Sequence, residues 1–355
     1  MHEQHARPLL AITLGDPAGI GPEVILKALR HPALYTKCRP VVIGDQRILA
    51  RAASWLDGAP PTLHTLPSAP GDLNASLSKL VEDPNEPFQP GNMVVLDLAN
   101  ADPQSIAPGV VSAAAGRAAV EAVFRACDLA LDHTVQAIVT APLNKEAMHL
   151  GGFNYPGHTE LLTERTGATQ VSMLLVGPSL RVVHVSTHVS LQEAIRRVQT
   201  PRVLEVIHLA QRSCRALGIA APRIAVAGLN PHAGEAGLFG DEETQQIVPA
   251  IKAARAQGLN VSDPMPPDTI FLRAVKGEYD IVVAMYHDQG HIPMKLLAFD
   301  SGVNVSMGLP IIRTSVDHGT AFDIAGTGVA DETSLLAAID VAVQMISAQH
   351  TQQST

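Results

Sequence analysis

The chain has 355 residues, of which 46% are hydrophobic and 17% charged, and its net charge is −9 with histidine neutral. This composition is typical of a compact α/β protein that is long enough for two domains. The negative charge and the 3% aromatic share argue against a nucleic-acid surface, and no apolar run reaches the roughly 18 residues that span a membrane.

The cysteines and histidines indicate which kinds of chemistry the protein can carry out. Cys38, Cys127 and Cys214 are widely spaced and include no CxxC pair, which predicts reduced thiols in the cytoplasm rather than a disulfide framework. The 15 histidines are an unusual number and indicate metal or proton chemistry. Since the chain is acidic, an anionic substrate needs a local positive site such as a metal, a basic side chain or a helix N-terminus.

The first predicted element is a strand at 9–14, which runs into GDPAGIGPEV and a helix that begins near Pro22. A strand, a Gly/Pro turn and a helix N-terminus together form a candidate anion or cofactor cradle. The segment is neither GxGxxG nor GxxxxGK, so the dinucleotide fingerprint and the P-loop are absent. An ordinary tight turn explains it equally well.

Strands and helices alternate through the next hundred residues. The predicted strands are 40–44, 93–98 and 135–142, and the predicted helices are 46–56 and 109–131. This alternation favours a mostly parallel sheet with helices on both faces. The segment 57–92 is rich in Pro, Ser, Asp and Asn and is predicted to be irregular or a small peripheral strand pair.

His158 and Thr159 in YPGHTELLTERTG are predicted to begin a helix, where side chains and free amides are available to an anion. Ordinary N-capping by Thr159 is the alternative. Two adjacent strands around a Gly-Pro turn follow, and His188 comes soon after the second. The later predicted strands are 223–227 and 279–285, and the later predicted helices are 201–217, 242–257 and a short one that opens at 267–269.

The stretch 286–326 gathers candidate polar residues among short apolar runs. These runs are typical of buried strands, so the polar groups are expected at strand ends and in loops, where open α/β sheets bind ligands. Lys295, Asn304 and Arg313 offer a point charge, an amide and a bidentate fork to a phosphate or carboxylate. A surface loop with scattered ion pairs is the alternative.

Three histidines, His188, His232 and His287, each follow a buried predicted strand by a few residues. Because strand ends of one sheet layer converge, the three imidazoles can meet and leave an open position on a catalytic divalent ion. Asp268 and Asp288 are candidate carboxylates to orient them. The spacing matches no local motif such as HExxH, and such histidines are often ordinary loop or core residues.

Seven segments occur in one order along the chain: GDPAGIGPE, PGHTE, THVSL, GLNPHAGE, PPDTIF, MYHDQG and GLPIIRTSVDHGTAFDIAG. With them the chain resembles the PdxA-type dehydrogenase family almost end to end. The resemblance implies a two-domain α/β fold akin to isocitrate and isopropylmalate dehydrogenases, with mostly parallel sheets flanked by helices and the active site in the interdomain cleft. We expect a discontinuous first domain (1–140 plus 305–355) and a second domain (141–304) with the dimer interface and most metal and substrate residues.

The resemblance also implies roles for particular residues. His188, His232 and His287 are expected to hold one divalent metal (zinc, or magnesium, manganese or cobalt), with one of them coming from the partner subunit of a homodimer. The expected substrate-binding residues are His158, Thr159, Lys295, Asn304 and Arg313. Asp268 matches an acidic residue near the metal, and Lys295 is expected to act as phosphate ligand or proton carrier.

The loop DHGTAFDIAG is similar to the cofactor-side loop of the β-decarboxylating dehydrogenases. It implies binding of NAD, or NADP, without a Rossmann fingerprint. The residues expected on the cofactor are Asp317, His318, Gly319 and Asp323.

The implied activity is the oxidative decarboxylation of 4-hydroxy-L-threonine 4-phosphate to 3-amino-2-oxopropyl phosphate, a reaction of vitamin B6 biosynthesis. However, His291 follows HDQG, where biosynthetic members usually carry an apolar residue. HDQGHIPMK is more similar to a branch that converts D-threonate or D-erythronate 4-phosphate to dihydroxyacetone phosphate in sugar-acid catabolism. The alternatives are a metal-dependent hydrolase or lyase without NAD, a non-catalytic phosphate-binding protein and an aromatic cis-dihydrodiol dehydrogenase.

Overall fold

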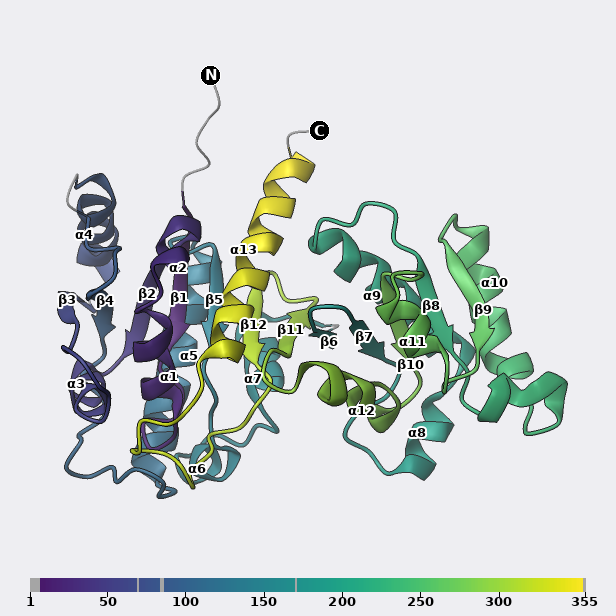
Figure 1. Ribbon diagram of the computed structural model, residues 1–355, viewed down its shortest axis with the longest axis horizontal. Helices are drawn as coiled ribbons and strands as arrows, with labels where there is room; N and C mark the ends of the chain where they lie inside the picture. The colour runs from purple at the N-terminus through teal and green to yellow at the C-terminus, as the bar shows by residue number, and fades with distance from the viewer. Residues whose placement is uncertain (1–6, 69, 84–85, 170, 354–355) are drawn as a thin grey trace. The chain divides into compact units, whose positions relative to one another are not determined.

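The computed structural model describes residues 7–68, 70–83, 86–169 and 171–353 and divides into two compact units (Figure 1). Unit 1 comprises Met1–Val171 and Gly308–Ile346, and unit 2 comprises Ser172–Met307 and Ser347–Thr355. The sequence analysis predicted the first domain boundary between residues 140 and 141, whereas the first part of unit 1 ends at Val171. His158 and Thr159 therefore belong to unit 1.

Unit 1 is built on parallel strands in the order β3-β4-β2-β1-β5-β12. The strands are β1 (Leu9–Thr13), β2 (Arg39–Gly44), β3 (Thr62–Leu66), β4 (Asn92–Asp97), β5 (Ala137–Thr140) and β12 (Arg313–Val316). The central strands are buried on both faces, as parallel sheets between helices require.

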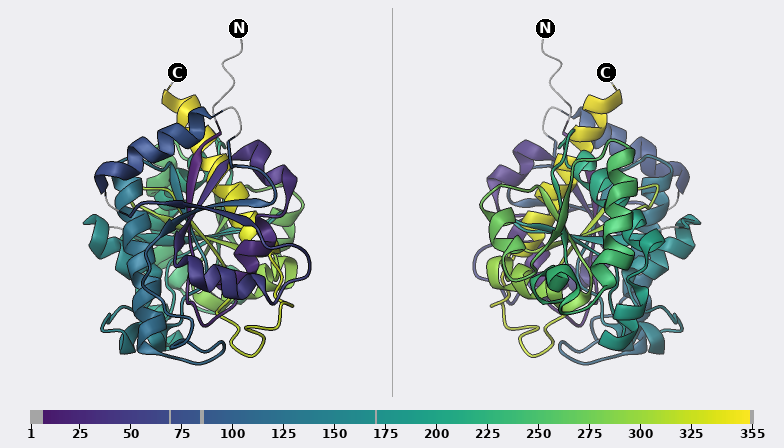
Figure 2. Two further views of the ribbon diagram at one scale, coloured as in Figure 1. Left: turned by 90° about the vertical axis from the view of Figure 1, so that its left-hand side faces the viewer. Right: turned by 90° about the vertical axis from the view of Figure 1, so that its right-hand side faces the viewer.

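The helices of unit 1 lie on both faces of its sheet (Figures 1 and 2). They are α1 (Gly21–Ala28), α2 (Pro32–Lys37), α3 (Gln46–Ala53), α4 (Pro70–Glu82), α5 (Ala113–Leu131), α6 (Lys145–Leu150), α7 (His158–Thr166) and most of α13 (Thr333–Gln353). The prediction for 57–92 was wrong, because β3 extends the main sheet and α4 is a helix. The mostly parallel sheet is confirmed.

Unit 2 contains a mixed sheet in the order β11-β6-β7-β10-β8-β9. The strands are β6 (Ser172–Val176), β7 (Arg181–His184), β8 (Ile224–Ala227), β9 (Val261–Met265), β10 (Ile281–Ala284) and β11 (Val303–Met307). Strand β6 is antiparallel to β11 and β7, whereas β7, β10, β8 and β9 pair in parallel. The predicted strand pair around Gly177 is thus confirmed.

The helical segments of unit 2 surround this sheet. They are α8 (Leu191–Arg197), α9 (Thr200–Ala216), the 3-10 segment η1 (Pro231–Gly237), the π-helical turn η2 (Glu243–Ile247), α10 (Val248–Ala256), α11 (Ile270–Val275) and α12 (His287–Ala298). Val182 of β7 and Ala284 of β10 pack against α11 and α12 in one apolar cluster. Because side chains alternate along a strand, His184 points to the same face as Val182.

Helix α12 corrects one expectation about the stretch 286–326. His287, Asp288, His291 and Lys295 were expected at strand ends and in loops, yet they lie on one helix that contains Pro293. The apolar runs further on do form the predicted strands β11 and β12. Residues 287, 291 and 295 therefore repeat every four positions along one helical face.

Two predictions about the chain as a whole can be compared with the structure. Cys38, Cys127 and Cys214 are all buried and free, which agrees with the predicted lack of a disulfide framework. Within the described ranges, every helix is too short or too polar to cross a membrane.

Candidate active site

Two of the three predicted metal ligands lie close together in unit 2. The ring centres of His188 and His287 are 5.5 Å apart. His188 follows β7, and His287 is the first residue of α12 after β10; β7 and β10 are parallel neighbours, so both residues leave the same edge of the sheet. The prediction that histidines following buried strands converge is therefore confirmed for this pair.

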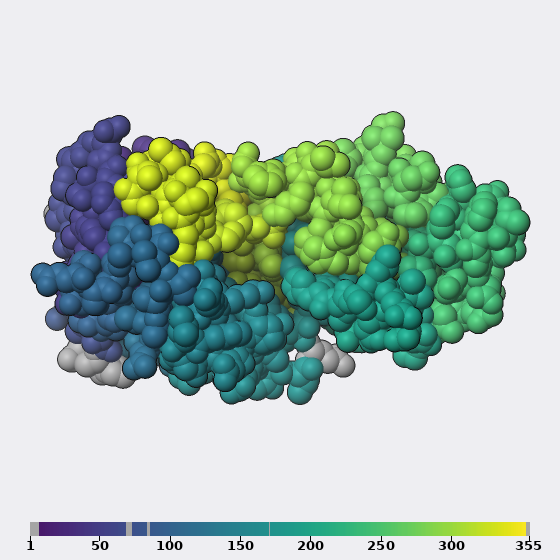
Figure 3. Space-filling model, turned by 90° about the horizontal axis from the view of Figure 1, so that it is seen from below, coloured from purple at the N-terminus to yellow at the C-terminus, as the bar shows by residue number. Residues whose placement is uncertain are grey.

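A cavity of about 530 Å³ adjoins these imidazoles. It is lined by residues 186–191, Ala194 and residues 286–288. Helix α8 and the start of α12, teal and green in Figure 3, contribute side chains to it. The cavity is large enough for a small ligand.

Asp288 orients the His287 ring. An oxygen of the Asp288 carboxylate lies 2.7 Å from His287 Nδ1, so the Nδ1–H form of the imidazole donates to it and Nε2 keeps its lone pair. Metal-ligating histidines commonly make this second hydrogen bond to a carboxylate. The donor set of His188 and His287 thus fits a divalent ion that accepts imidazole nitrogen, such as zinc or cobalt.

His232 is not gathered with this pair. Its ring lies 6.1 Å from the ring of Phe239, centre to centre, and the described residues of a single chain contain no group of three or more potential metal ligands. The side chain is exposed on η1. A single chain therefore presents two imidazoles at one place and the third at another.

The loop that carries His232 has an unusual backbone. His232, Ala233, Glu235 and Ala236 all have positive φ, between 43° and 54°, a conformation that costs non-glycine residues free energy. The buried Glu243 carboxylate holds the base of the loop, accepting from the amides of Leu229 and Asn230 at 2.7 and 2.8 Å. The loop is therefore preformed by its neighbours rather than by local preference.

Positive φ is concentrated in the predicted site segments. Eight non-glycine residues of the described chain have it, and six of them are His188, the four residues of η1 and Ala321. Such backbone outliers cluster at functional sites, where the surrounding structure holds them. This distribution supports the prediction that the THVSL, GLNPHAGE and DHGTAFDIAG segments belong to a functional site.

The other predicted residues of unit 2 are spread over three elements. Lys295 is half-buried on α12, with Nζ 5.6 Å from the centre of the Phe299 ring. Asn304 on β11 donates from Nδ2 to Met173 Sδ at 2.9 Å, while its buried Oδ1 has no hydrogen-bond partner. Asp268 is exposed in the turn before α11. A buried amide oxygen without a partner is available to a ligand.

The predicted residues of unit 1 include a buried arginine that acts electrostatically on a histidine. Arg313, 2% exposed at the start of β12, donates from Nη2 to Thr140 Oγ1 at 2.8 Å. Burial lowers the pKa of Arg313 to about 9, so the guanidinium stays charged at neutral pH. Burial and the Arg313 charge together lower the pKa of His158 well below its usual value, so the imidazole is neutral.

Helix α7 begins at His158, as predicted, but Thr159 does not cap it. The N-cap is Gly157, and no side chain caps the helix. His158 Nε2 is buried without a hydrogen-bond partner. Uncapped amides, an unpaired ring nitrogen and a nearby cation are together the features of an anion site at a helix N-terminus.

The predicted cofactor-side loop is fastened to α1. The buried Glu23 carboxylate accepts from the amides of Gly326 and Gly328 at 2.6 and 2.8 Å, and the Ile20 amide donates to Thr320 O at 3.1 Å. The GDPAGIGPE segment therefore fixes the backbone of the cofactor-side loop through these hydrogen bonds.

The four residues predicted on the cofactor differ in their surroundings. His318 Nδ1 lies 2.9 Å from Gly319 O, and the Asp317 amide donates to Ser334 Oγ at 3.4 Å. Gly319 and Asp323 are exposed. The loop therefore presents a glycine and a carboxylate to solvent from a fastened backbone.

His184 and Asp16 are buried polar residues that the sequence analysis did not select. His184 is the last residue of β7, and its ring centre lies 6.5 Å from that of His287 and 4.7 Å from that of His291. Asp16 lies in the first Gly/Pro turn and is fully buried. The spacing of four residues between 184 and 188, and again between 287 and 291, was the available signal for the histidines.

Comparisons with known proteins show what the chain as a whole is similar to. The family model for "Pyridoxal phosphate biosynthetic protein PdxA" matches residues 36–342. A D-threonate 4-phosphate dehydrogenase from Cupriavidus necator is 50% identical, covering 94% of this chain and 95% of its own. A 4-hydroxythreonine-4-phosphate dehydrogenase from Desulforapulum autotrophicum is 45% identical, covering 95% of each chain.

A solved structure of similar fold is also known. The crystal structure of 4-hydroxythreonine-4-phosphate dehydrogenase from Klebsiella pneumoniae matches with a TM-score of 0.83 and 47% identity, over 96% of this chain and 99% of that one. The α/β fold class and the predicted dehydrogenase class are thereby confirmed.

Proposed function

The chain belongs to the PdxA family of dehydrogenases, and from this premise we propose that it oxidatively decarboxylates a 4-phosphorylated four-carbon hydroxy acid, using NAD and a divalent metal. The observation that carries the proposal is the His188–His287 pair beside a cavity. The Asp288 carboxylate is hydrogen-bonded to His287 Nδ1, which leaves His287 Nε2 for a metal. A carboxylate–imidazole pair of this kind prepares a metal ligand.

We propose D-threonate 4-phosphate as the first substrate to assay. Relatives of that name are 46–51% identical, and relatives and solved structures named for 4-hydroxythreonine 4-phosphate are 45–49% identical. The stronger ground for this order is His291, which follows HDQG here. The second candidate is 4-hydroxy-L-threonine 4-phosphate, which is favoured by the name of the Klebsiella structure. The two substrates differ at C2, which carries a hydroxyl in one and an amine in the other.

The chemistry is the same for both substrates. Hydride leaves C3 and the hydroxyl loses its proton, which gives a β-keto acid; the C1–C2 bond then breaks, CO2 leaves and C2 takes up a proton. A divalent ion held by the imidazoles supplies a Lewis acid for the oxygen on C3, and NAD supplies the hydride acceptor. Lys295 and Asp268 are our candidates for moving protons, because both are titratable groups of unit 2.

The residues of unit 1 are assigned to anion binding. Arg313 is charged and buried, and a guanidinium binds a carboxylate or phosphate through two parallel hydrogen bonds. His158 offers its unpaired Nε2, and the first turn of α7 offers amides. Because His158 is neutral, its ring does not repel the Arg313 guanidinium. Lys295 and Asn304 of unit 2 remain predicted substrate-binding residues.

We further propose that the protein is a homodimer and that His232 is supplied by the second subunit. Two observations support this: His232 is apart from the other ligands in one chain, and it projects from a preformed loop. The neighbouring Leu238 and Phe239 are 72% and 47% exposed. Apolar side chains beside such a loop are typical of a surface covered by a partner.

The first experiment measures NADH formation by the metal-loaded protein with the two phosphorylated acids assayed side by side. We expect NADH with one of them, and a higher kcat/KM for D-threonate 4-phosphate. Product formation without NADH would instead support the hydrolase or lyase alternative. Binding of the acids without any turnover, unchanged by His188→Ala, would support the non-catalytic alternative.

The second experiment tests the shared site with inactive variants. Mixing and reassociating His188→Ala and His232→Ala subunits is expected to restore about a quarter of wild-type activity, since half of the dimers are hybrids with one intact site of two. The matched control mixes His188→Ala with His287→Ala, which leaves no intact site if both residues act in one chain. Recovery in the control mixture alone would assign His287, not His232, to the partner.

A further inference from the structure

Three imidazoles stack in sequence in unit 2, from the interior of the sheet outwards. The rings of His287 and His291 are 3.7 Å apart between centres and 10° from parallel. The His291 ring is in turn 4.7 Å from His184, with 35° between their planes. His184 belongs to β7 and the other two to α12. The stack therefore joins the proposed metal ligand His287 to the core.

The stack depends on close packing between α12 and β7. A Cβ on Gly290 would lie 2.3 Å from His184 Nε2, so only glycine lets the helix approach the buried ring this closely. Gln289 fixes the same turn: its Nε2 donates to Gly228 O at 2.8 Å, and its Oε1 accepts from the Met285 amide at 2.7 Å. The first turn of α12 is thus tied by Gln289 to the residues that follow β8 and β10, and it packs on β7 at Gly290.

Two contacts restrict the His287 ring. Asp288 lies on its edge at Nδ1, and His291 covers its face. His291 is itself tethered, with Nδ1 3.0 Å from the carbonyl oxygen of His287. A ring held at its edge and its face keeps one plane, and a stacked neighbour excludes other orientations of the ring. Nε2 of His287 therefore points in one direction.

His184, the innermost imidazole of the stack, lowers the stability of the folded chain. His184 is 4% exposed, and neither of its ring nitrogens makes a well-formed hydrogen bond. Burial and the neighbouring imidazoles lower its pKa to about 3, and the backbone near His287 offsets this only in part, so the ring stays neutral. An aliphatic side chain would fill the position without unpaired polar atoms. Fold stability does not account for a histidine here.

We propose that His184 and His291 are positioning residues, which fix the plane of the His287 ring for metal binding. The inference rests on the proposed function, in which His287 is a ligand. His291 acts on the face of that ring directly, and His184 supports His291 from behind. Neither residue needs to touch the metal or the substrate.

The test compares His291→Ala with His291→Phe, because the first removes the ring and the second keeps a flat ring at the same place. The readouts are the Kd for cobalt(II), the visible absorption of the bound cobalt and the ring ¹⁵N spectrum of the metal-free dimer. We expect His291→Ala to raise the Kd about tenfold, as loss of such supporting contacts typically does, and to broaden the cobalt spectrum. His291→Phe should stay within about threefold of wild type.

Further variants keep the outcomes distinct. His287→Ala is the control for the proposed function: if it binds cobalt as tightly as wild type, the metal assignment fails and this inference with it. If His287→Ala loses cobalt but His291→Ala keeps the wild-type Kd and spectrum, only the positioning role is overturned. Equal weakening by Ala and Phe would also overturn it. His291→Leu replaces His291→Ala if circular dichroism shows that the alanine variant is unfolded.

Discussion

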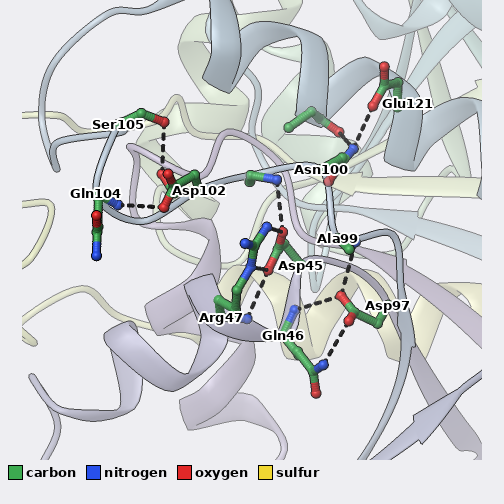
Figure 4. A network of polar contacts seen from close by, with 12 residues as sticks. Asp45, Gln46, Arg47, Asp97, Ala99, Asn100, Asp102, Gln104, Ser105 and Glu121 are labelled. Carbon is green, nitrogen blue, oxygen red and sulfur yellow. Dashed lines mark hydrogen bonds and ion pairs between the residues drawn. The ribbon is translucent and has the colours of Figure 1, made fainter.

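Asp16 and Asp45 follow neighbouring parallel strands of one sheet, β1 and β2, and both are fully buried, yet they differ in their partners. Asp45 accepts from the amides of Arg47 and Ala101 at 2.9 and 2.8 Å and from the Arg47 side chain (Figure 4). Asp16 Oδ1 accepts from the Ala18 amide at 2.8 Å, while its Oδ2 has no hydrogen-bond partner.

The pKa values move in opposite directions as a result. Burial raises the pKa of Asp45, but the hydrogen bonds from Arg47 and Ala101 outweigh it and leave the value below its ordinary one. Burial raises the pKa of Asp16 to about 6, despite amide donors at Ala18 and Asn144. The balance between burial and the donors and charges around it decides whether a buried carboxylate stabilises the folded chain. Four predictions test this contrast.

Asp45→Ala should have the largest effect, lowering the free energy of unfolding of unit 1 by about 3–4 kcal/mol. The change removes the N-cap of α3 and leaves the buried Ala101 amide unpaired. Urea unfolding followed by the fluorescence of Trp55, the single tryptophan, measures it. Arg47→Ala is the matched comparison and should lose less, because it removes only half-exposed side-chain donors and keeps the two amide hydrogen bonds to Asp45; a loss as large as that of Asp45→Ala would contradict the importance of the amide contacts.

Asp16→Asn should have the opposite sign, raising the free energy of unfolding at pH 7 by about 3 kcal/mol. The folded chain holds the Asp16 proton up to about pH 6, whereas the unfolded chain releases it near its ordinary pKa of 3.8. Wild type therefore loses stability as the pH rises through this window. The same tryptophan assay at pH 4 and pH 7 should give a difference near zero at pH 4. A constant difference at both pH values would show that titration of Asp16 is not the cause.

Glu23→Gln extends the comparison to a carboxylate whose two oxygens each accept from one backbone amide. The glutamine oxygen can accept from only one of Gly326 and Gly328, so we expect a loss of about 1–2 kcal/mol. Amide hydrogen exchange should speed up at Gly326 and Gly328 first. Unchanged protection at both glycines would show that the loop is held by other contacts.

His184→Leu should have the smallest effect on stability, a gain of about 1 kcal/mol, because it removes two buried nitrogens without hydrogen bonds. Thermal unfolding of the metal-free protein measures it, with Val182→Ala as a control that should destabilise the same strand. A clear loss of stability in His184→Leu would mean that the ring is kept for packing rather than for the orientation of His287.

The strands were the most predictable part of the fold, since runs such as PVVIG, IAVA and IVVA are apolar, β-branched and bounded by turn residues. Helix α12 was not predicted, because Gly290 and Pro293 have the poorest helix propensities. Its tertiary contacts explain why it forms: Gln289 is hydrogen-bonded in the interior and Met294 is 1% exposed. Such contacts override local preference and cannot be counted from the sequence.

The site was predictable where it followed local rules. His188 and His287 were predicted to converge because they follow buried strands, and Asp288 was predicted as a carboxylate partner of an imidazole. The roles of His184 and Asp16 depend instead on which atoms remain without partners once β7 meets α12 and β1 meets the loop after β5. Those are long-range packing facts, and the metal, cofactor and substrate assignments of the remaining residues stay predictions.

The division of unit 1 along the chain has a consequence for synthesis on the ribosome. Glu23, Lys27 and Lys37 bind residues about 303 positions later in the sequence, and β12 pairs with β5 in the same sheet. Unit 1 can therefore not be completed until residues 308–346 have emerged, whereas unit 2 lies almost wholly before them. At roughly 5–20 residues per second, the unfinished sheet waits on the order of ten seconds with its β5 edge unpaired.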